Sequence, residues 1–371
     1  MKPRVMIGLN AAWNLANFRG GLIRALLAAG YEVVAVAPTD DHVQRVRELG
    51  ARFVALPMDS RGRHPGRDLL LLWRLFRIMR AERPSVYLGF TIKPNIYGSL
   101  VARLLGVPVI NNITGLGEVF SRGGPITALV RGLYRAALKR SLTVFFQNDE
   151  DQQLFIDAGL ASPSVTLRLP GSGIDIARFA LTPLPHNTPV RFLLIARLLW
   201  DKGIRQYVEA GRLLRARGVP VQLQLLGFTD DHNPASASSQ DVADWQAQGL
   251  VQYLGVSHDV RSEIAQADCI VLPSYYREGT PRTLLEAAAM GRPIITTDSI
   301  GCRDVVDDGL NGYLCRQRDP QDLADKLERL VALSPKEREA MGRRGREKME
   351  QEFDERIVIQ RYLAAIALAV R

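Results

Sequence analysis

One stretch, residues 269–297, constrains the fold more than any other part of the chain. It begins with a short apolar run typical of a buried strand (269–273) and continues through a polar loop (274–280). A helix is then expected, with Thr280 as its N-cap, Pro281 in its first position and Gly291 at its end. A second apolar run, 293–297, follows. This strand–loop–helix–strand order predicts an α/β protein with a parallel sheet.

Two carboxylates lie around the start of that helix. Glu278 is in the loop, and Glu286 is on the helix. A helix start offers unused N–H groups, here those of Arg282, Thr283 and Leu284, and a partial positive charge that suits a diphosphate. Glu278 could then contact a group beyond the phosphates, and Glu286 could accept hydrogen bonds from a ribose. The alternative is two ordinary surface glutamates.

Size and composition describe a globular chain with more than one domain. The 371 residues suit two or three domains, 47% of them are hydrophobic, and no apolar run is long enough to span a bilayer. Three cysteines (Cys269, Cys302, Cys315) and five histidines show no metal-ligand spacing, so reduced cytosolic thiols and no metal are expected.

The positive charge is uneven along the chain. The net charge is +9, and residues 1–186 hold 23 Lys and Arg against 13 Asp and Glu, whereas the rest is nearly neutral. An anionic partner is therefore expected for the first half. No nucleic-acid motif is present, so we expect no nucleic acid and favour a membrane surface.

The first half has the pattern of a Rossmann-like domain. A strand at residues 5–9, a loop that runs to Gly20 and Gly21, a helix at 22–29 and a strand at 31–37 form a βαβ start. The two glycines could let the backbone approach a phosphate, or they could form an ordinary turn. Lys93 and Thr114 each follow a later strand, where parallel sheets bind ligands, and they predict a second phosphate site.

Residues 61–84 hold seven arginines against two acids. Leu69, Leu72, Trp73, Phe76 and Met79 suggest an apolar stripe, flanked by Arg67, Arg74, Arg77 and Arg80. Such a helix can lie in a membrane interface, where each Arg contributes about 1 kcal/mol near anionic lipid. A core helix with solvated arginines is the alternative.

The second half starts with another strand and a basic loop. Prolines 183, 185 and 189 mark a linker, so we expect domains at residues 1–183 and 188–354. Arg197 and Lys202 follow the strand at 191–196. Together they could compensate the charge of a diphosphate without a metal, or they could be two surface cations in a turn.

Several of these segments resemble family 4 retaining glycosyltransferases. The resemblance rests on EGTPRTLLE at residues 278–286, its continuation to 314, and RLLWDKG at 197–203. FTIKPNIYGS, ITGLG and SRG at 60–62 resemble the bacterial subgroup that extends undecaprenyl-diphosphate-linked sugars, including an N-acetylgalactosaminyltransferase acting on lipid-linked diacetylbacillosamine.

The resemblance implies the GT-B fold, two facing Rossmann-like domains with an interdomain donor cleft, and a C-terminal helix (355–371) that packs back on the first domain. The implied reaction moves a hexose or N-acetylhexosamine from a nucleoside-diphosphate sugar, UDP favoured, to a polyprenyl-diphosphate-linked saccharide. By this resemblance, the activity is expected to serve surface polysaccharide assembly, such as that of lipopolysaccharide and O-antigen, at the inner face of the cytoplasmic membrane.

The resemblance also assigns roles to residues. The catalytic residues are Arg197, Lys202 and Glu278, and the lipid-linked acceptor contacts Lys93, Arg61 and Thr114. The residues expected to bind the donor are Glu286, Gly279, Thr280, Arg282, Thr283, Leu284, Gly20 and Gly21. Many relatives have a His near the sugar, where this chain has Asn111, Asn112, Ile113 and Thr114.

Two other functions remain open at this point. A nucleotide-sugar epimerase of the same fold would convert donor without an acceptor. A non-catalytic sugar- or lipid-binding module would release no nucleotide. Fold alone does not separate these functions from transfer.

Overall fold

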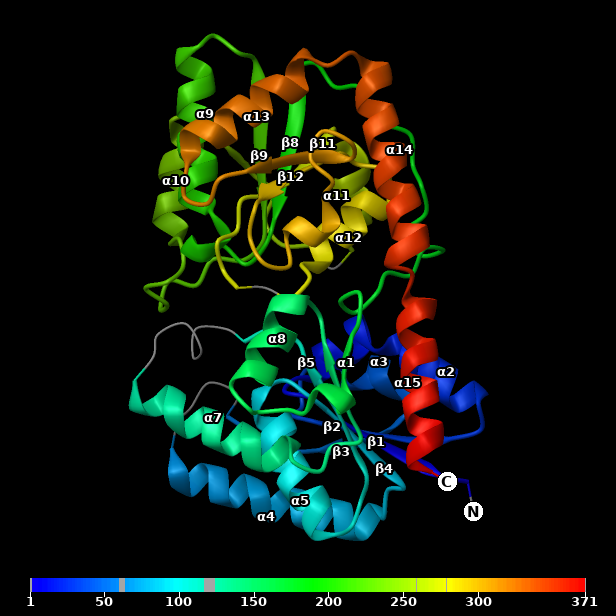
Figure 1. The fold of residues 1–371 in the computed structure, drawn as a ribbon. Helices are drawn as coiled ribbons and strands as arrows, with labels where there is room; N and C mark the ends of the chain where they lie inside the picture. Colours follow the sequence, from blue (N-terminus) through cyan, green and yellow to red (C-terminus); the bar gives the residue numbers. More distant parts are fainter. Residues whose placement is uncertain (1, 60–63, 117–123, 258, 278, 371) are drawn as a thin grey trace. The chain divides into compact units, whose positions relative to one another are not determined.

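The structure is a computed structural model that describes residues 2–59, 64–116, 124–257, 259–277 and 279–370. It divides into two compact units, Met1–Ser172 with Glu355–Arg371, and Gly173–Asp354. Figure 1 shows the elements of each unit. In the described residues, no helix combines the length and the hydropathy needed to cross a membrane.

The first unit is a parallel sheet covered by helices on both faces. Its strand order is β3-β2-β1-β4-β5-β6-β7. The strands are β1 Arg4–Gly8, β2 Glu32–Ala37, β3 Arg52–Ala55, β4 Val86–Phe90, β5 Val109–Ile113, β6 Thr143–Phe146 and β7 Thr166–Arg168. The helices are α1 Ala12–Phe18, α2 Gly20–Ala28, α3 Val43–Glu48, α4 Pro65–Glu82, the π-helix η1 Pro94–Gly98, α5 Ser99–Leu104, α7 Pro125–Leu138, α8 Asp149–Asp157, the 3-10 helix η2 Pro163–Val165 and α15 Glu355–Ala369.

Alternate residues of the central strands feed two cores, as a sheet buried on both faces requires. Val5 and Ile7 of β1 pack with α1, α2 and α15, whereas Met6 packs with α4 and α5. The C-terminal helix belongs to this unit. Its Tyr362 lies with its ring centroid 4.9 Å from that of Phe145, and its hydroxyl accepts a hydrogen bond from Asn112 Nδ2 at 2.5 Å.

The second unit repeats the architecture with strand order β10-β9-β8-β11-β12-β13, all parallel. Its strands are β8 Val190–Ile195, β9 Val221–Leu226, β10 Gln252–Tyr253, β11 Cys269–Leu272, β12 Ile294–Thr297 and β13 Gly312–Cys315. Its helices are the 3-10 helix η3 Trp200–Lys202, α9 Ile204–Ala216, α10 Ser239–Ala247, α11 Arg261–Gln266, α12 Arg282–Ala289, the 3-10 helix η4 Arg303–Val305, α13 Pro320–Ala332 and α14 Pro335–Glu352.

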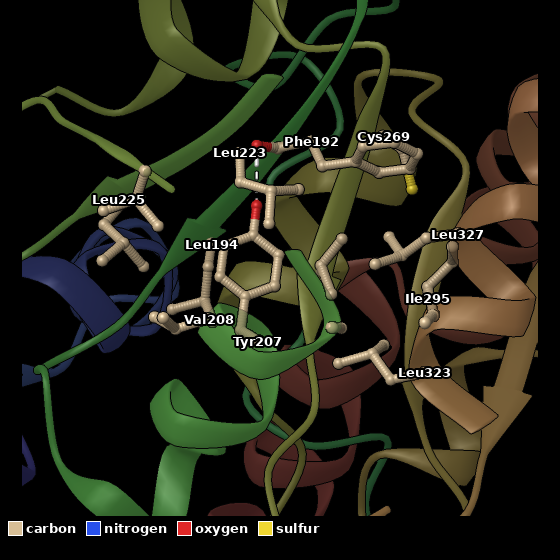
Figure 2. Close-up of a cluster of buried hydrophobic side chains, with 14 of the residues drawn as sticks. Phe192, Leu194, Tyr207, Val208, Leu223, Leu225, Cys269, Ile295, Leu323 and Leu327 are labelled. Atoms are coloured by element: carbon tan, nitrogen blue, oxygen red, sulfur yellow. Dashed lines mark hydrogen bonds between the residues drawn. The ribbon is translucent and has the colours of Figure 1, made fainter. Parts of the chain in front are cut away.

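A buried tyrosine fixes α9 against the central strand of this sheet. Tyr207 donates a hydrogen bond to the Phe192 carbonyl at 2.8 Å, inside a cluster that includes Leu194 and Leu323 (Figure 2). Burial raises the pKa of the Tyr207 hydroxyl well above its usual value, so it stays a donor. Because α9 follows Gly203 directly, this bond also fixes the end of the loop that carries Arg197 and Lys202.

The boundary between the units lies earlier than residues 183–188, where the prolines suggested it. Ile174 and Phe179 pack in the core of the second unit with α12 and α14. Arg346 of α14 donates to the Phe179 carbonyl at 2.8 Å, and the buried Arg292 donates to the Pro183 carbonyl at 2.8 Å. The extended proline segment therefore lies on the second unit and is part of it.

Both sheets reverse their strand order at one point, between β1 and β4 in the first unit and between β8 and β11 in the second. In open parallel sheets, ligands bind beyond the carboxyl ends of the strands at such a reversal. Ligand-binding segments are therefore expected after Ile195 and Leu272 in the second unit, and after Gly8 and Phe90 in the first.

Candidate functional site

The loop after β8 is pressed against the segment after β11. Gly203 has φ of +80°, and a Cβ atom on it would lie 2.1 Å from the Pro273 carbonyl oxygen. Only glycine tolerates both that backbone conformation and that approach. The end of the loop thus lies directly on the end of β11.

Hydrogen bonds hold the same two segments together. The Asp201 carbonyl accepts from the amides of Tyr275 at 2.9 Å and Tyr276 at 3.2 Å, and from the Ser274 hydroxyl at 3.3 Å. The Lys202 ammonium lies 5.0 Å from the centroid of the Tyr276 ring, within cation–π range. Lys202 is therefore held at the carboxyl edge of the sheet, while Arg197, at the end of β8, is exposed.

The start of α12 lies beside the end of β8. The hydroxyl of Thr283, in the first turn of α12, donates a hydrogen bond to the Ile195 carbonyl at 3.2 Å. Ile195 is two residues before Arg197. The structure therefore brings the basic loop and the helix start together at one edge of one sheet, although the sequence separates them by about eighty residues.

The helix begins later than the sequence pattern suggested. Pro281, not Thr280, is the N-cap, and Arg282 is the first helical residue. The Leu284 amide donates to the Pro281 carbonyl at 3.1 Å, so the expectation that it is available to a ligand is wrong. The Thr283 amide lies in the first turn, where an N–H group has no carbonyl of its own helix to bond to.

Glu286 lies one turn further along, and its side chain retains 15% of its exposure. Arg282 Nε donates to Glu286 Oε1 at 3.0 Å. Burial raises the pKa of Glu286, and the nearby Arg282 and Arg178 oppose that rise. Arg282 and Glu286 are four residues apart on one helix, and this spacing was the available signal for an ion pair that the prediction missed.

Two other residues expected to bind the donor lie just before this helix. Gly279 is buried and Thr280 is half-buried, just before Pro281. Glu278 is outside the described residues. The arrangement offers a fixed cation, helix amides and a carboxylate in one place, which is the chemistry that a nucleotide diphosphate with its ribose requires.

In the first unit, Lys93 has a carboxylate partner that the sequence analysis missed. Its ammonium lies 2.6 Å from Asp68 Oδ1, and Tyr97 donates to Asp68 Oδ2 at 2.8 Å. Burial and the Asp68 carboxylate raise the pKa of Tyr97 above its usual value. Asp68 is one of only two acids in the arginine-rich segment 61–84, and that rarity was the available signal.

The backbone around Lys93 is unusual. Thr91, at the end of β4, has φ of +59°, which is costly for a β-branched residue, and a π-helix begins at Pro94. Both features are common at functional sites. Thr114 lies half-buried just after β5 on the same sheet edge, and Arg61 lies outside the described residues.

The glycine pair is not at a strand-to-helix turn, contrary to expectation. Residues 12–18 form α1, so Gly20 and Gly21 open the second helix of the unit. A Cβ atom on Gly21 would lie 2.5 Å from Glu355 Oε2. The absence of a side chain therefore leaves room for the carboxylate of Glu355, the first residue of α15, and no phosphate role for the pair follows from this geometry.

Comparisons with known proteins agree with this architecture. Residues 182–348 match the family described as glycosyl transferases group 1, and residues 16–171 match the glycosyl transferase 4-like domain. The chain is 26% identical to the N,N'-diacetylbacillosaminyl-diphospho-undecaprenol alpha-1,3-N-acetylgalactosaminyltransferase of Campylobacter jejuni, over 95% of this chain and 96% of the relative.

Two further likenesses cover nearly the whole chain. Glycogen synthase of Mycobacterium tuberculosis is 30% identical to this chain, and the match covers 98% of this chain and 92% of the synthase. The crystal structure of Anabaena HepE in complex with UDP and glucose has a TM-score of 0.79 at 17% identity, and the match covers 98% of this chain and 99% of that one.

The fold and these matches define the class: the protein is a glycosyltransferase with the GT-B fold. The chain belongs to the family 4 glycosyltransferases, as its motifs suggested.

Proposed function

We propose that the protein transfers a hexose or N-acetylhexosamine from a UDP-sugar to a saccharide linked to a polyprenyl diphosphate, with retention at the anomeric carbon. The Campylobacter relative is named for a diphospho-undecaprenol acceptor, and the Anabaena neighbour was solved with UDP. The observation that carries the proposal is the docking of residues 201–203 onto 273–276, beside the start of α12.

The proposed mechanism assigns leaving-group stabilisation to this edge. As the bond from the anomeric carbon to the UDP oxygen breaks, negative charge grows on the diphosphate. Arg197, Lys202 and the amide of Thr283 stabilise that charge before it is neutralised. The acceptor oxygen forms its bond to the anomeric carbon on the face that UDP leaves, and a phosphate oxygen of that UDP takes the proton of the acceptor hydroxyl. No separate base is needed in this scheme, and the two side-chain cations and the amide take the place of a metal.

The remaining roles are part of the same proposal. Glu286 binds the ribose hydroxyls and Glu278 positions the donor sugar. Lys93, oriented by Asp68, binds the acceptor diphosphate together with Arg61 and Thr114. The pathway served is the assembly of a surface polysaccharide such as an O-antigen.

This function predicts acceptor-dependent release of UDP. Purified protein is incubated with UDP- and GDP-sugars, with or without an undecaprenyl-diphosphate-linked saccharide, in buffer containing EDTA. UDP release is expected only with the acceptor present. Conversion of the donor without acceptor would indicate an epimerase. The absence of UDP release with every donor and acceptor pair would indicate a binding module. Loss of activity in EDTA that Mg²⁺ restores would indicate a metal-dependent reaction.

The protein is further proposed to bind the cytoplasmic membrane from its inner face through α4. Leu71, Leu75 and Met79 of this helix are buried, so of the residues expected to form the apolar stripe only Met79 is on the buried face. Leu69 and Trp73 remain 67% and 53% exposed. The guanidinium of Arg77 lies 4.8 Å from the centre of the Trp73 ring, and Arg67 and Arg80 are exposed on the same helix. Aromatic and basic side chains together suit an anionic lipid interface.

Vesicle flotation tests this surface. Replacing Arg67, Arg77 and Arg80 with glutamine is expected to lower the partition coefficient on phosphatidylglycerol vesicles by on the order of 100-fold, since each Arg contributes about 1 kcal/mol. Arg74 is left intact because it donates to the Pro57 carbonyl at 2.8 Å and supports the unit itself. The matched control replaces Arg212, Arg343 and Arg344 of the second unit. Equal retention of both variants would refute binding through α4.

A further inference from the structure

Helix α12 begins with a cation at a position that helix electrostatics disfavour. Arg282 is its first residue, where the helix already carries partial positive charge. The order Arg-then-Glu over four residues is also the less favourable one for a helical ion pair. Helix stability alone therefore does not favour an arginine at this position, and its side-chain contacts offer another role.

The Arg282 side chain binds one carboxylate oxygen of Glu286 and does not bind the other. Arg282 Nε donates to Oε1 at 3.0 Å, and the side chains retain 14% and 15% of their exposure. Among the residues that the structure describes, Oε2 has no hydrogen-bond partner. The side chain keeps some exposure, so Oε2 has acceptor capacity left for a ligand, and hydroxyl groups are suitable donors.

The surrounding charges come from three elements. Arg282 lies on the same helix as Glu286, Arg178 lies in the segment before β8, and Asp259 lies in the loop before α11. Arg261 holds Asp259 through Nε at 2.8 Å and, with Arg178, lowers the pKa of Asp259 to about 2. Asp259 thus stays charged. Burial and the Asp259 charge disfavour the ionised form of Glu286, whereas Arg282 and Arg178 favour it.

We propose that the Arg282 side chain is a positioning residue for the donor: it holds Glu286 as an oriented carboxylate whose Oε2 accepts hydrogen bonds from the hydroxyls of the nucleotide-sugar. The inference rests on the proposed function and extends it, because that function assigns no role to the Arg282 side chain. Without the guanidinium, Glu286 would rotate or take up a proton, and a protonated carboxyl loses part of its capacity as an acceptor.

The test compares Arg282→Gln with wild type by titration with UDP and by the pH profile of kcat/KM for the donor sugar. The donor KM is expected to rise about tenfold at neutral pH, the loss expected when a charge-assisted hydrogen bond is removed. The acid limb of the profile is expected to move to higher pH, because a group that lowers the pKa of Glu286 is gone. Arg282→Lys keeps the charge and is expected to keep the acid limb near its wild-type position, with a smaller rise in KM.

The control is Arg212→Gln, which removes an exposed helical ion pair with Glu209 in the same unit and leaves both readouts unchanged. If wild type itself does not bind UDP, the proposed function fails. If wild type binds UDP and folded Arg282→Gln shows the wild-type KM and acid limb, only the present inference fails. Should Arg282→Gln not fold, Arg282→Lys with wild-type KM, or with the acid limb displaced to higher pH, overturns it.

Discussion

Lys202→Ala is expected to lower kcat about 100- to 1000-fold at saturating donor, with a much smaller change in donor KM. Removing one preorganised group that stabilises developing charge costs about that much in enzymes of known mechanism. Here the charge develops on the leaving diphosphate, so the ammonium acts mainly in the transition state and less in the bound ground state. The measurement is steady-state UDP release with the lipid-linked acceptor present.

Lys202→Arg and Arg205→Ala are the matched comparisons. Arginine keeps the positive charge and is expected to recover part of kcat. Arg205 is the next cation along the chain, and its guanidinium lies 4.9 Å from the Trp200 ring, so its loss is expected to have little effect. If Lys202→Ala raised KM strongly while kcat stayed at its wild-type value, the ammonium would serve binding and not the chemical step.

Gly203→Ala is expected to lower both stability and activity, because the added Cβ meets backbone. It would lie 2.1 Å from the Pro273 carbonyl oxygen, at a residue with φ of +80°. The loop must move off β11 to relieve this contact, and it takes Lys202 with it. We expect a loss of about 3 kcal/mol in the free energy of unfolding, as for overpacking with backbone strain, and at least a tenfold fall in kcat.

Gly218→Ala separates backbone strain from the loss of docking. Gly218 has φ of +72° in the same unit, and a Cβ atom there would meet nothing within 4 Å. Its replacement is expected to lower the free energy of unfolding by only about 1–2 kcal/mol, the cost of a left-handed backbone conformation for alanine, and to leave kcat unchanged. Equal losses of stability and activity in both alanine variants would mean that contact with Pro273 does not position the loop.

The architecture could be predicted from the sequence because it follows from local patterns. Apolar runs separated by helical segments predict parallel sheets, and short motifs such as EGTPRTLLE identify the family. Helix boundaries were less certain. Thr280 looked like an N-cap, but Pro281 takes that position, and the Leu284 amide donates to the Pro281 carbonyl in a 3-10-type bond.

The side-chain partners within the sites could not be predicted in this way. Asp68 binds Lys93 and Tyr97 across 25 and 29 residues, and no periodicity relates these positions. Gly21 lies against the Glu355 carboxylate, which comes more than three hundred residues later in the chain. Such contacts depend on which distant segments the fold brings together, and a local sequence pattern contains no information about that.

The most direct test of the account is a crystal structure of the protein with UDP. We predict the diphosphate oxygens within hydrogen-bonding distance, about 2.7–3.2 Å, of Lys202 Nζ, the guanidinium of Arg197 and the amide of Thr283. A UDP molecule whose phosphates contact neither the loop 197–203 nor the first turn of α12 would contradict the central claim, that these two segments bind the same diphosphate.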